Sequence, residues 1–499
     1  MRRPLLQRRP WHDMIRSLRI LILLFSWLSI GGIRTSSVSA PPSPGFASYL
    51  GLADCDGIAE WHGDLFLACH SVRNQLPGQV RELGQRASKG DAYVVRLSPT
   101  TGKLVYATRL GGSGSSRAFR IKVDRKGFAY AAGDTRARDF PTTPDAVQRN
   151  FGGGQSDAFV VKLAPDGSVV YSTFLGGTGD EESYGLDLDD RGGVFVGGTT
   201  WSADFPGQRT AHAAVHGDAF VSYLRTGDAT SLRSVLFGGS QEEKLAGIAL
   251  DARGGLFAVG HTKSTDFPLL HPLQAELKGA QNVFLVRLSA RSLVPTFATY
   301  FGGSGEDYGW GVAVDPQGNP VIAGTTSSRD LPAAADAFQG ALKGGLDAFV
   351  ARFQGAGYHE IRVTYFGGSK DDSSGFDGDD VKVDSADNVW LVGFTASPDL
   401  PGTAGFPPQP GREENRGFIA AFSPSLARLC FAAYDGGAEG EQLEGLALSS
   451  NGLAFATGSS FSSEIPAEAL VDQGKKASRL NGNEVHTRIL AVPLTASCR

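Results

Sequence analysis

Hydrophobic and polar residues alternate in short runs along most of the chain, and the same succession of runs recurs. One cycle holds four such runs, at residues 299–301, 311–314, 320–325 and 348–353. Runs this short, rich in Val, Ile, Phe and Tyr and bounded by Gly, Pro, Asn and Asp, are typical of β-strands. The nearest candidate for a helix, residues 336–342, is short, so we predict an all-β protein.

A pair of glycines after an aromatic or apolar residue marks the repeat. Its spacing is 62 to 69 residues, and a looser copy begins at Tyr49. The first glycine of each pair is Gly111, Gly176, Gly238, Gly302, Gly367 or Gly436. The units start near residues 49, 109, 174, 236, 300, 365 and 434. Seven units of four strands predict a seven-bladed β-propeller of four-stranded antiparallel blades over residues 46–499.

The phase of the repeat predicts how the ring closes. The propeller region begins with a first-run strand at residues 46–50 and ends on a fourth-run strand at residues 489–494. We expect the N-terminal strand to complete the last blade, because closure hides sheet edges that would otherwise pair with other chains. Pro493 is an objection, since proline removes a hydrogen-bond donor from the ladder.

Several repeated aspartates are interpreted as scaffold. Residues 315–319 read Asp-Pro-Gln-Gly-Asn, which predicts a tight turn with a side-chain acceptor and a residue that tolerates positive φ. Carboxylates before Phe-Pro or Leu-Pro are expected to accept backbone N–H groups. These carboxylates are Asp139, Asp204, Asp266, Asp330 and Asp399. The aspartates that open the fourth strand are also assigned to the scaffold, namely Asp91, Asp157, Asp218 and Asp347.

The recurring order of Tyr-Phe-Gly-Gly, Val-Asp-x-x-Gly, Gly-Thr-Thr, Asp-Phe/Leu-Pro and Asp-Ala-Phe-Val resembles the bacterial SBBP β-propeller repeat. The resemblance is clear over about residues 90–460 and weaker in the two end units. It implies a secreted or surface-attached bacterial protein. The family offers no catalytic residues to carry over.

Residues 1–40 have the composition of a secretory signal peptide. Six arginines precede an apolar run from Ile20 to Ile33, and small residues follow as far as Ala40. This run is short for a membrane span, which needs about 20 residues, although an uncleaved N-terminal anchor stays open. Residues 41–45 are a short linker. We expect the protein to be secreted, periplasmic or attached to the bacterial cell surface.

The charge balance narrows the classes of partner. Without residues 1–40, which hold seven Arg and one Asp, the chain has 40 basic and 51 acidic residues. This excess of acidic residues disfavours binding to nucleic acid or to anionic membrane surfaces. We expect a monomer with no membrane span once the signal segment is removed. Its expected partner is a protein or a glycan on the cell surface or outside the cell.

The chain has four cysteines, two in the first unit and two in the last. They are Cys55, Cys69, Cys430 and Cys498. An even number of cysteines in an exported chain predicts disulfides. Three pairings are possible, and we expect Cys55–Cys69 and Cys430–Cys498. No Cys-x-x-Cys or matching His spacing indicates a zinc site.

Acidic residues follow the glycine pair in successive units and are expected to gather on one rim of the ring. They include Asp180, Glu182, Glu306, Asp307, Asp371 and Asp372. Clustered carboxylates suit Ca²⁺, but no segment matches an EF-type calcium loop. Solvated acidic turns are the alternative to a calcium site, and no other cofactor is expected.

Residues that break the symmetry of the repeat are better candidates for a binding site. Trp201 and Trp310 stand where other units carry small or polar residues, with Tyr184 and Tyr308 nearby. Exposed aromatic side chains beside carboxylates can form a surface that binds sugars or peptides. Packing between blades is the alternative for all four. Trp390 lies within a strand run and is expected in the core.

No G-x-S-x-G, P-loop, H-E-x-x-H or Rossmann glycine motif is present. We therefore expect an exported propeller that acts as a binding or structural module for surface proteins or glycans, rather than an enzyme. The alternative is an extracellular glycan lyase or hydrolase with its site at the mouth of the central channel. The sequence does not identify catalytic residues for it.

Overall fold

The computed structural model describes residues 46–50, 53–71, 80–84, 90–101, 103–207, 216–376, 378–402, 415–435, 440–461 and 486–494 of the 499-residue chain. Only the backbone is described for residues 46–50. The signal peptide and linker predicted for residues 1–45 lie outside the described residues, so both stay predictions.

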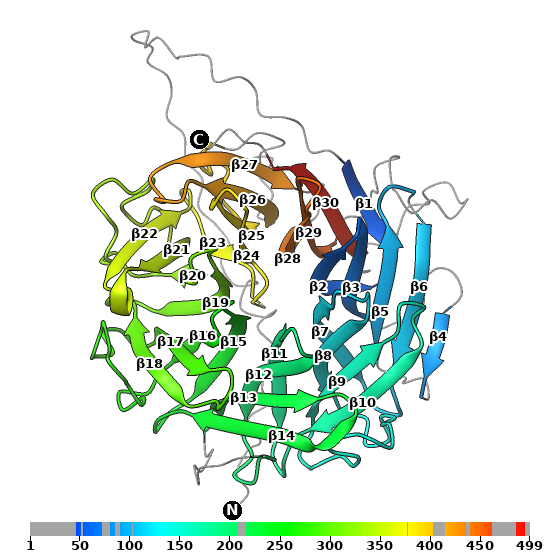
Figure 1. Cartoon of the computed structure of the whole chain (residues 1–499). Coiled ribbons are helices and arrows are strands. Elements are labelled where there is room, and N and C mark those ends of the chain that lie inside the picture. The colour runs from blue at the N-terminus through cyan, green and yellow to red at the C-terminus, as the bar shows by residue number, and fades with distance from the viewer. Residues whose placement is uncertain are drawn as a thin grey trace, which may run out of the picture. The chain divides into compact units, whose positions relative to one another are not determined.

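Seven sheets radiate around one axis and form the predicted β-propeller (Figure 1). From the axis outward, blades 1 and 2 contain β2 (Asp54–Trp61), β3 (Asp64–Ser71), β5 (Asp91–Ser98) and β6 (Lys103–Leu110), then β7 (Ser116–Val123), β8 (Ala129–Thr135), β9 (Asp157–Leu163) and β10 (Val169–Leu175). Blades 3 and 4 contain β11 (Glu181–Leu188), β12 (Gly193–Thr200), β13 (Asp218–Arg225) and β14 (Asp228–Phe237), then β15 (Glu243–Leu250), β16 (Gly255–Thr262), β17 (Asn282–Ser289) and β18 (Pro295–Phe301).

The remaining blades follow the same order. Blade 5 contains β19 (Asp307–Val314), β20 (Pro320–Thr326), β21 (Asp347–Gln354) and β22 (Glu360–Phe366). Blade 6 contains the split inner strand β23 (Asp372–Ser374) and β24 (Val381–Val383), then β25 (Val389–Thr395), β26 (Arg416–Phe422) and β27 (Leu429–Asp435). Blade 7 contains β28 (Glu441–Leu448), β29 (Leu453–Ser460), β30 (His486–Pro493) and β1 (Phe46–Leu50).

Three details depart from seven identical four-stranded blades, and the first is the split inner strand of blade 6. Blade 1 has a fifth strand, β4 (Val80–Leu83), which pairs in parallel with β6 and was not predicted. The one helical segment among the described residues is the 3₁₀ turn Ala356–Tyr358, and residues 336–342 are not helical. No helix in this part of the chain is long and apolar enough to cross a membrane.

The ring closes as predicted, through the N-terminal strand. β1 pairs antiparallel with β30, from Phe46 opposite Ala491 to Leu50 opposite Thr487. Pro493 lies beyond the last of these pairs, so its missing N–H does not interrupt the closing ladder.

The repeated aspartates act as the sequence predicted. Asp315 accepts hydrogen bonds from the backbone N–H groups of Gln317 (2.9 Å) and Asn319 (2.7 Å), and Gly318 has a φ of 84°. The carboxylates before Phe-Pro and Leu-Pro each accept an N–H from the loop after the glycine pair, as Asp204 does from Thr178 at 2.9 Å. The same bond recurs at Asp139, Asp266, Asp330 and Asp399.

The hydrophobic core lies between blades. Phe66 of blade 1 packs in one cluster with Ile121 and Phe159 of blade 2. Trp390 of blade 6 is only 1% exposed and shares a cluster with Leu446 of blade 7, which confirms its assignment to the core. Burying a large apolar side chain contributes about 1.5–3 kcal/mol, so neighbouring blades stabilise one another.

The predicted disulfide Cys55–Cys69 joins β2 to β3. Cys430 is also disulfide-bonded. Its expected partner, Cys498, lies outside the described residues.

We predict that the double substitution Cys55→Ala/Cys69→Ala lowers the free energy of unfolding by about 3 kcal/mol, because the crosslink closes a short loop in the unfolded chain. Chemical denaturation of oxidised wild-type and variant protein measures this difference. Equal denaturation midpoints would show that the crosslink does not stabilise the ring.

Candidate ligand-binding site at the axis

The innermost strand of six blades carries a β-bulge at the same position, and we use these bulges to define the candidate site. In six blades the register between the first two strands shifts at the same place, for example between Ser183 and Gly185 in blade 3. A bulge leaves one residue unpaired and re-aims its side chain, and bulges are over-represented beside functional sites.

We define the axial rim by three positions in each of the six blades with a bulge, and by the one equivalent pair, Ser373 and Phe394, in blade 6. The three positions are the bulge residue, the residue two places before it, and the partner of that residue on the next strand. The axial rim comprises Asp54, Asp56, His70, Arg117, Phe119, Asp134, Glu182, Tyr184, Thr199, Lys244, Ala246, His261, Tyr308, Trp310, Thr325, Ser373, Phe394, Gln442, Glu444 and Ser459. The scaffold positions repeat from blade to blade, whereas these positions differ in all seven.

Aromatic side chains from blades 4 to 6 occupy one part of the axial rim. Tyr308 and Trp310 stack with ring centroids 5.5 Å apart and planes 9° apart, and His261 of blade 4 contacts both at 5.1 Å. Phe376 of blade 6 packs against Trp310 at 5.6 Å and is 40% exposed. The group therefore presents apolar rings to solvent beside the axis.

Charged side chains of the axial rim come from blades 1 to 4 and from Glu444 of blade 7, and the rings of Phe119 and Tyr184 lie among them. Arg117 donates to Asp134 at 3.0 Å within blade 2, and Lys244 of blade 4 lies 3.8 Å from Glu182 of blade 3. The Arg117 and Lys244 side chains are 43% and 40% exposed, so both cations are accessible to a ligand.

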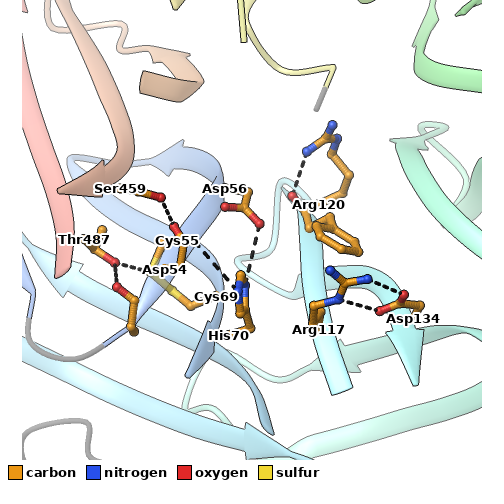
Figure 2. A network of polar contacts seen from close by, with 12 residues as sticks. Asp54, Cys55, Asp56, Cys69, His70, Arg117, Arg120, Asp134, Ser459 and Thr487 are labelled. Carbon is orange, nitrogen blue, oxygen red and sulfur yellow. Dashed lines mark hydrogen bonds and ion pairs between the residues drawn. A yellow bond between two sulfur atoms is a disulfide. The ribbon is translucent and has the colours of Figure 1, made fainter. Parts of the chain in front are cut away.

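In blade 1, His70 lies between two carboxylates (Figure 2). Its Nε2 is 3.8 Å from Asp54 and its Nδ1 is 3.8 Å from Asp56. Asp56 is buried, whereas the Asp54 and His70 side chains are each 24% exposed.

Burial changes the ionisation of several groups in the axial rim. It lowers the pKa of His261 to about 3, with the charges of Lys244 and Lys263 adding to the effect, so this ring is neutral. Burial, with Glu306 nearby, raises the pKa of Tyr308 to about 12. Burial also raises the pKa of Glu182, although Lys244 opposes the effect.

Blade 6 replaces the bulge by a longer insertion. Its inner strand takes twelve residues from Asp372 to Val383, where β19 takes eight. The connection extends inward from blade 6 (Figure 1), and Asp379 forms a parallel bridge with Gly445 of blade 7. The Asp379 carboxylate binds Lys382 at 2.6 Å and Lys122 of blade 2 at 3.3 Å. The insertion therefore joins blades 2, 6 and 7 across the axis.

The structure separates the four aromatic residues singled out from the sequence. Tyr184, Tyr308 and Trp310 belong to the axial rim, where Tyr184 packs on Phe119 of blade 2 at 5.0 Å. Trp201 lies in the loop after β12, and its backbone N–H donates to the backbone oxygen of Asp180 at 3.0 Å. No ring contact joins Trp201 to the other three among the described residues.

The six acidic residues considered for Ca²⁺ have separate roles. Asp307 and Asp372 are buried and accept the backbone N–H of the second glycine of the pair, at 2.8 and 2.7 Å. Asp180 and Asp371 accept backbone N–H groups from neighbouring loops, Glu306 accepts from Tyr308, and Glu182 faces Lys244. A calcium site on these residues stays a prediction.

Sequence reasoning singled out Glu182 but missed the other charged residues of the axial rim. Within the described ranges, one group of three His, Cys, Asp or Glu residues is compact enough to hold a metal ion, and it is Asp54, Asp56 and His70. Aligning the units on the glycine that follows the bulge (Gly57, Gly185) would have placed these residues beside Tyr184 and Trp310.

No protein family matches this chain, and the similar proteins described here are distant from it. The regulatory protein FlaEY of Caulobacter vibrioides is 25% identical over 324 residues, covering 61% of this chain and 33% of that protein, so the chain spans a third of its length. A solved protein of unknown function from Dyadobacter fermentans is 11% identical with a TM-score of 0.37, covering 90% of this chain and 99% of that one. The polysaccharide lyase PL25, an ulvan lyase, is 8% identical with a TM-score of 0.43, covering 83% of this chain and 92% of that one. Likenesses this distant carry no argument about function.

We predict that Asp380→Asn changes how stability depends on pH. Asp380 is fully buried at the end of the insertion, and burial raises its pKa from 3.8 to about 7. The folded chain therefore holds this proton more tightly than the unfolded chain. As a result, the contribution of Asp380 to the free energy of unfolding decreases as pH rises from about 4 to about 7. In thermal unfolding, the melting temperature of the variant should therefore rise relative to that of the wild type between pH 5 and pH 8.

The matched control is Asp371→Asn, which changes an exposed aspartate in the same blade. A difference in melting temperature between Asp380→Asn and wild type that stays constant with pH would contradict the assignment.

Proposed function

We propose that this protein is an exported binding module that takes a charged glycan on the axial rim. The observation that carries the proposal is the division of the axial rim into an aromatic part with Tyr308 and Trp310 and a charged part with Arg117 and Lys244. A site must break the symmetry of the repeat, and the axial rim is where the blades differ.

Each part suits one feature of a glycan. The apolar faces of Trp310 and the exposed ring of Phe376 can pack on the C–H faces of sugar rings. Arg117 and Lys244 can donate charge-assisted hydrogen bonds to the carboxylate or sulfate groups of an acidic sugar. Both cations already face a carboxylate, so a ligand would compete with Asp134 and Glu182 for them.

Export rests on three supporting features. The first is the signal-like segment at residues 1–40, and the second is the resemblance to the bacterial SBBP repeat. The third is the Cys55–Cys69 disulfide, since disulfides persist in oxidising compartments. A monomeric protein on the cell surface, in the periplasm or secreted is the setting we propose.

One observation favours the alternative, an extracellular glycan lyase or hydrolase. His70 and the carboxylates of Asp54 and Asp56 converge beside the aromatic and cationic side chains that would hold the sugar. A histidine between carboxylates can act as a general acid or base. Release of reducing ends or unsaturated sugars from acidic polysaccharides, lost in His70→Ala, would establish this activity.

The binding proposal is tested with oxidised protein lacking residues 1–40, on an array of acidic and neutral bacterial and plant glycans. We expect acidic glycans to bind, and Trp310→Ala to weaken binding at least tenfold, as truncation of a central aromatic contact does. Titration calorimetry with the best glycan gives the affinities, and circular dichroism checks folding.

Trp201→Ala is the matched control, because Trp201 is also partly buried but lies outside the axial rim. Unchanged binding in Trp201→Ala is expected. Loss of binding in Trp201→Ala but not in Trp310→Ala, or no glycan bound by the wild type, would contradict the proposal.

A further inference from the structure

We infer that Asp54, Asp56 and His70 form a binding site for a divalent transition-metal ion such as Zn²⁺. The inference does not depend on the glycan proposal. In the part of the chain that the structure describes, these three residues are the one group of potential ligands whose donor atoms all lie within 4.8 Å of one another.

The backbone places all three donors on one side of the sheet. Asp54 pairs directly with His70 across β2 and β3, so their side chains project from the same face. The bulge between Cys55 and Gly57 brings the Asp56 side chain next to them (Figure 2). The distance of 3.8 Å between His70 Nδ1 and Asp56 compares with about 3.4 Å between ligand atoms of a tetrahedral ion at 2.0–2.1 Å. Asp54 lies 3.8 Å from the other ring nitrogen, Nε2, so its carboxylate must rotate to share an ion bound at Nδ1. One donor atom from each of the three residues already lies within 4.8 Å of the other two.

His70 gives independent support for a ligand. Its Nδ1 is sealed from solvent and has no hydrogen-bond partner among the described residues. Buried polar atoms are nearly always satisfied, and one that is not needs an explanation such as a bound ion. Since Asp56 is the carboxylate nearest to this nitrogen, we assign Nδ1 as the metal-binding atom.

Neighbouring groups hold the three ligands in place. The Cys55–Cys69 disulfide crosslinks β2 and β3 at the residues next to the ligands. The Ser459 hydroxyl of blade 7 donates to Asp54, and Thr487 donates to the backbone oxygen of Ala53 at 2.7 Å. Outer partners of this kind orient metal ligands, and their loss typically costs 10- to 100-fold in affinity.

Charge and donor type favour a transition metal over Ca²⁺ or Mg²⁺. Two carboxylates neutralise a divalent ion, and an imidazole nitrogen suits Zn²⁺ better than the hard ions that prefer oxygen. Figure 2 draws two cations beside this group: Arg117 is paired with Asp134 in its own blade, and Arg120 donates to the backbone oxygen of Phe119. Three protein ligands leave one position open for water or an incoming group, and the partly exposed Asp54 and His70 leave that position accessible from the axial rim.

Isothermal titration of oxidised, metal-free protein with Zn²⁺ alone tests the site, with Mn²⁺ and Ca²⁺ as comparison ions. We expect one Zn²⁺ per chain. Affinity should fall at least 100-fold in His70→Ala and in Asp56→Asn and about tenfold in Ser459→Ala. His359→Ala and Asp371→Asn are matched controls, since both residues are exposed and lie outside the axial rim, and they should leave Zn²⁺ binding unchanged.

No Zn²⁺ binding by folded wild-type protein, or equal binding in His70→Ala, would overturn the inference. X-ray absorption of the Zn²⁺-loaded wild type keeps the test decisive if a variant fails to fold. A first shell of oxygen donors with one imidazole is expected, and a shell with two or more imidazoles would place the ion elsewhere.

Discussion

Each blade buries its two faces only against its neighbours, so no blade is complete until the ring closes. The interblade clusters show this directly, since Phe66 of blade 1 shares its core with Ile121 and Phe159 of blade 2. The last gap is closed by the pairing of β1 with β30. Buried carboxylates also fix the loops between blades by accepting hydrogen bonds from them. Glu181, for example, accepts hydrogen bonds from Thr200 at 2.6 Å and from Gly177 at 3.0 Å.

This constraint explains where the blades are free to differ. Residues that pack between blades or hold the turns recur in most units, because a change in one of them disturbs two blades. The bulge residues are released from the ladder, so Asp56, Tyr184 and Trp310 can occupy equivalent positions without altering the sheet. The insertion in blade 6 lies at the equivalent place in its inner strand and contacts blades 2 and 7 through Asp379. The axial rim is therefore where this scaffold can carry a specific ligand.

The repeat made the fold predictable. Residues that differ from their equivalents in the other units made part of the site predictable. The period and phase led to seven blades and to closure by β1, and they singled out Tyr184, Tyr308 and Trp310. Trp201 also breaks the repeat, but it lies in a loop outside the axial rim. Apart from Glu182, the charged residues of the axial rim were missed because their proximity depends on strand register. Asp54 and His70 meet only through strand pairing, and Lys122 meets Asp379 from 257 residues away.

The central claim is that function resides in the axial rim and not in the repeated scaffold. Anomalous diffraction from crystals of the oxidised protein grown with Zn²⁺ tests it most directly, because it locates a bound ion without assuming its ligands. The account predicts one peak between β2 and β3, within bonding distance of Asp54, Asp56 and His70. Peaks on the loops after the glycine pairs, with none at His70, would contradict it.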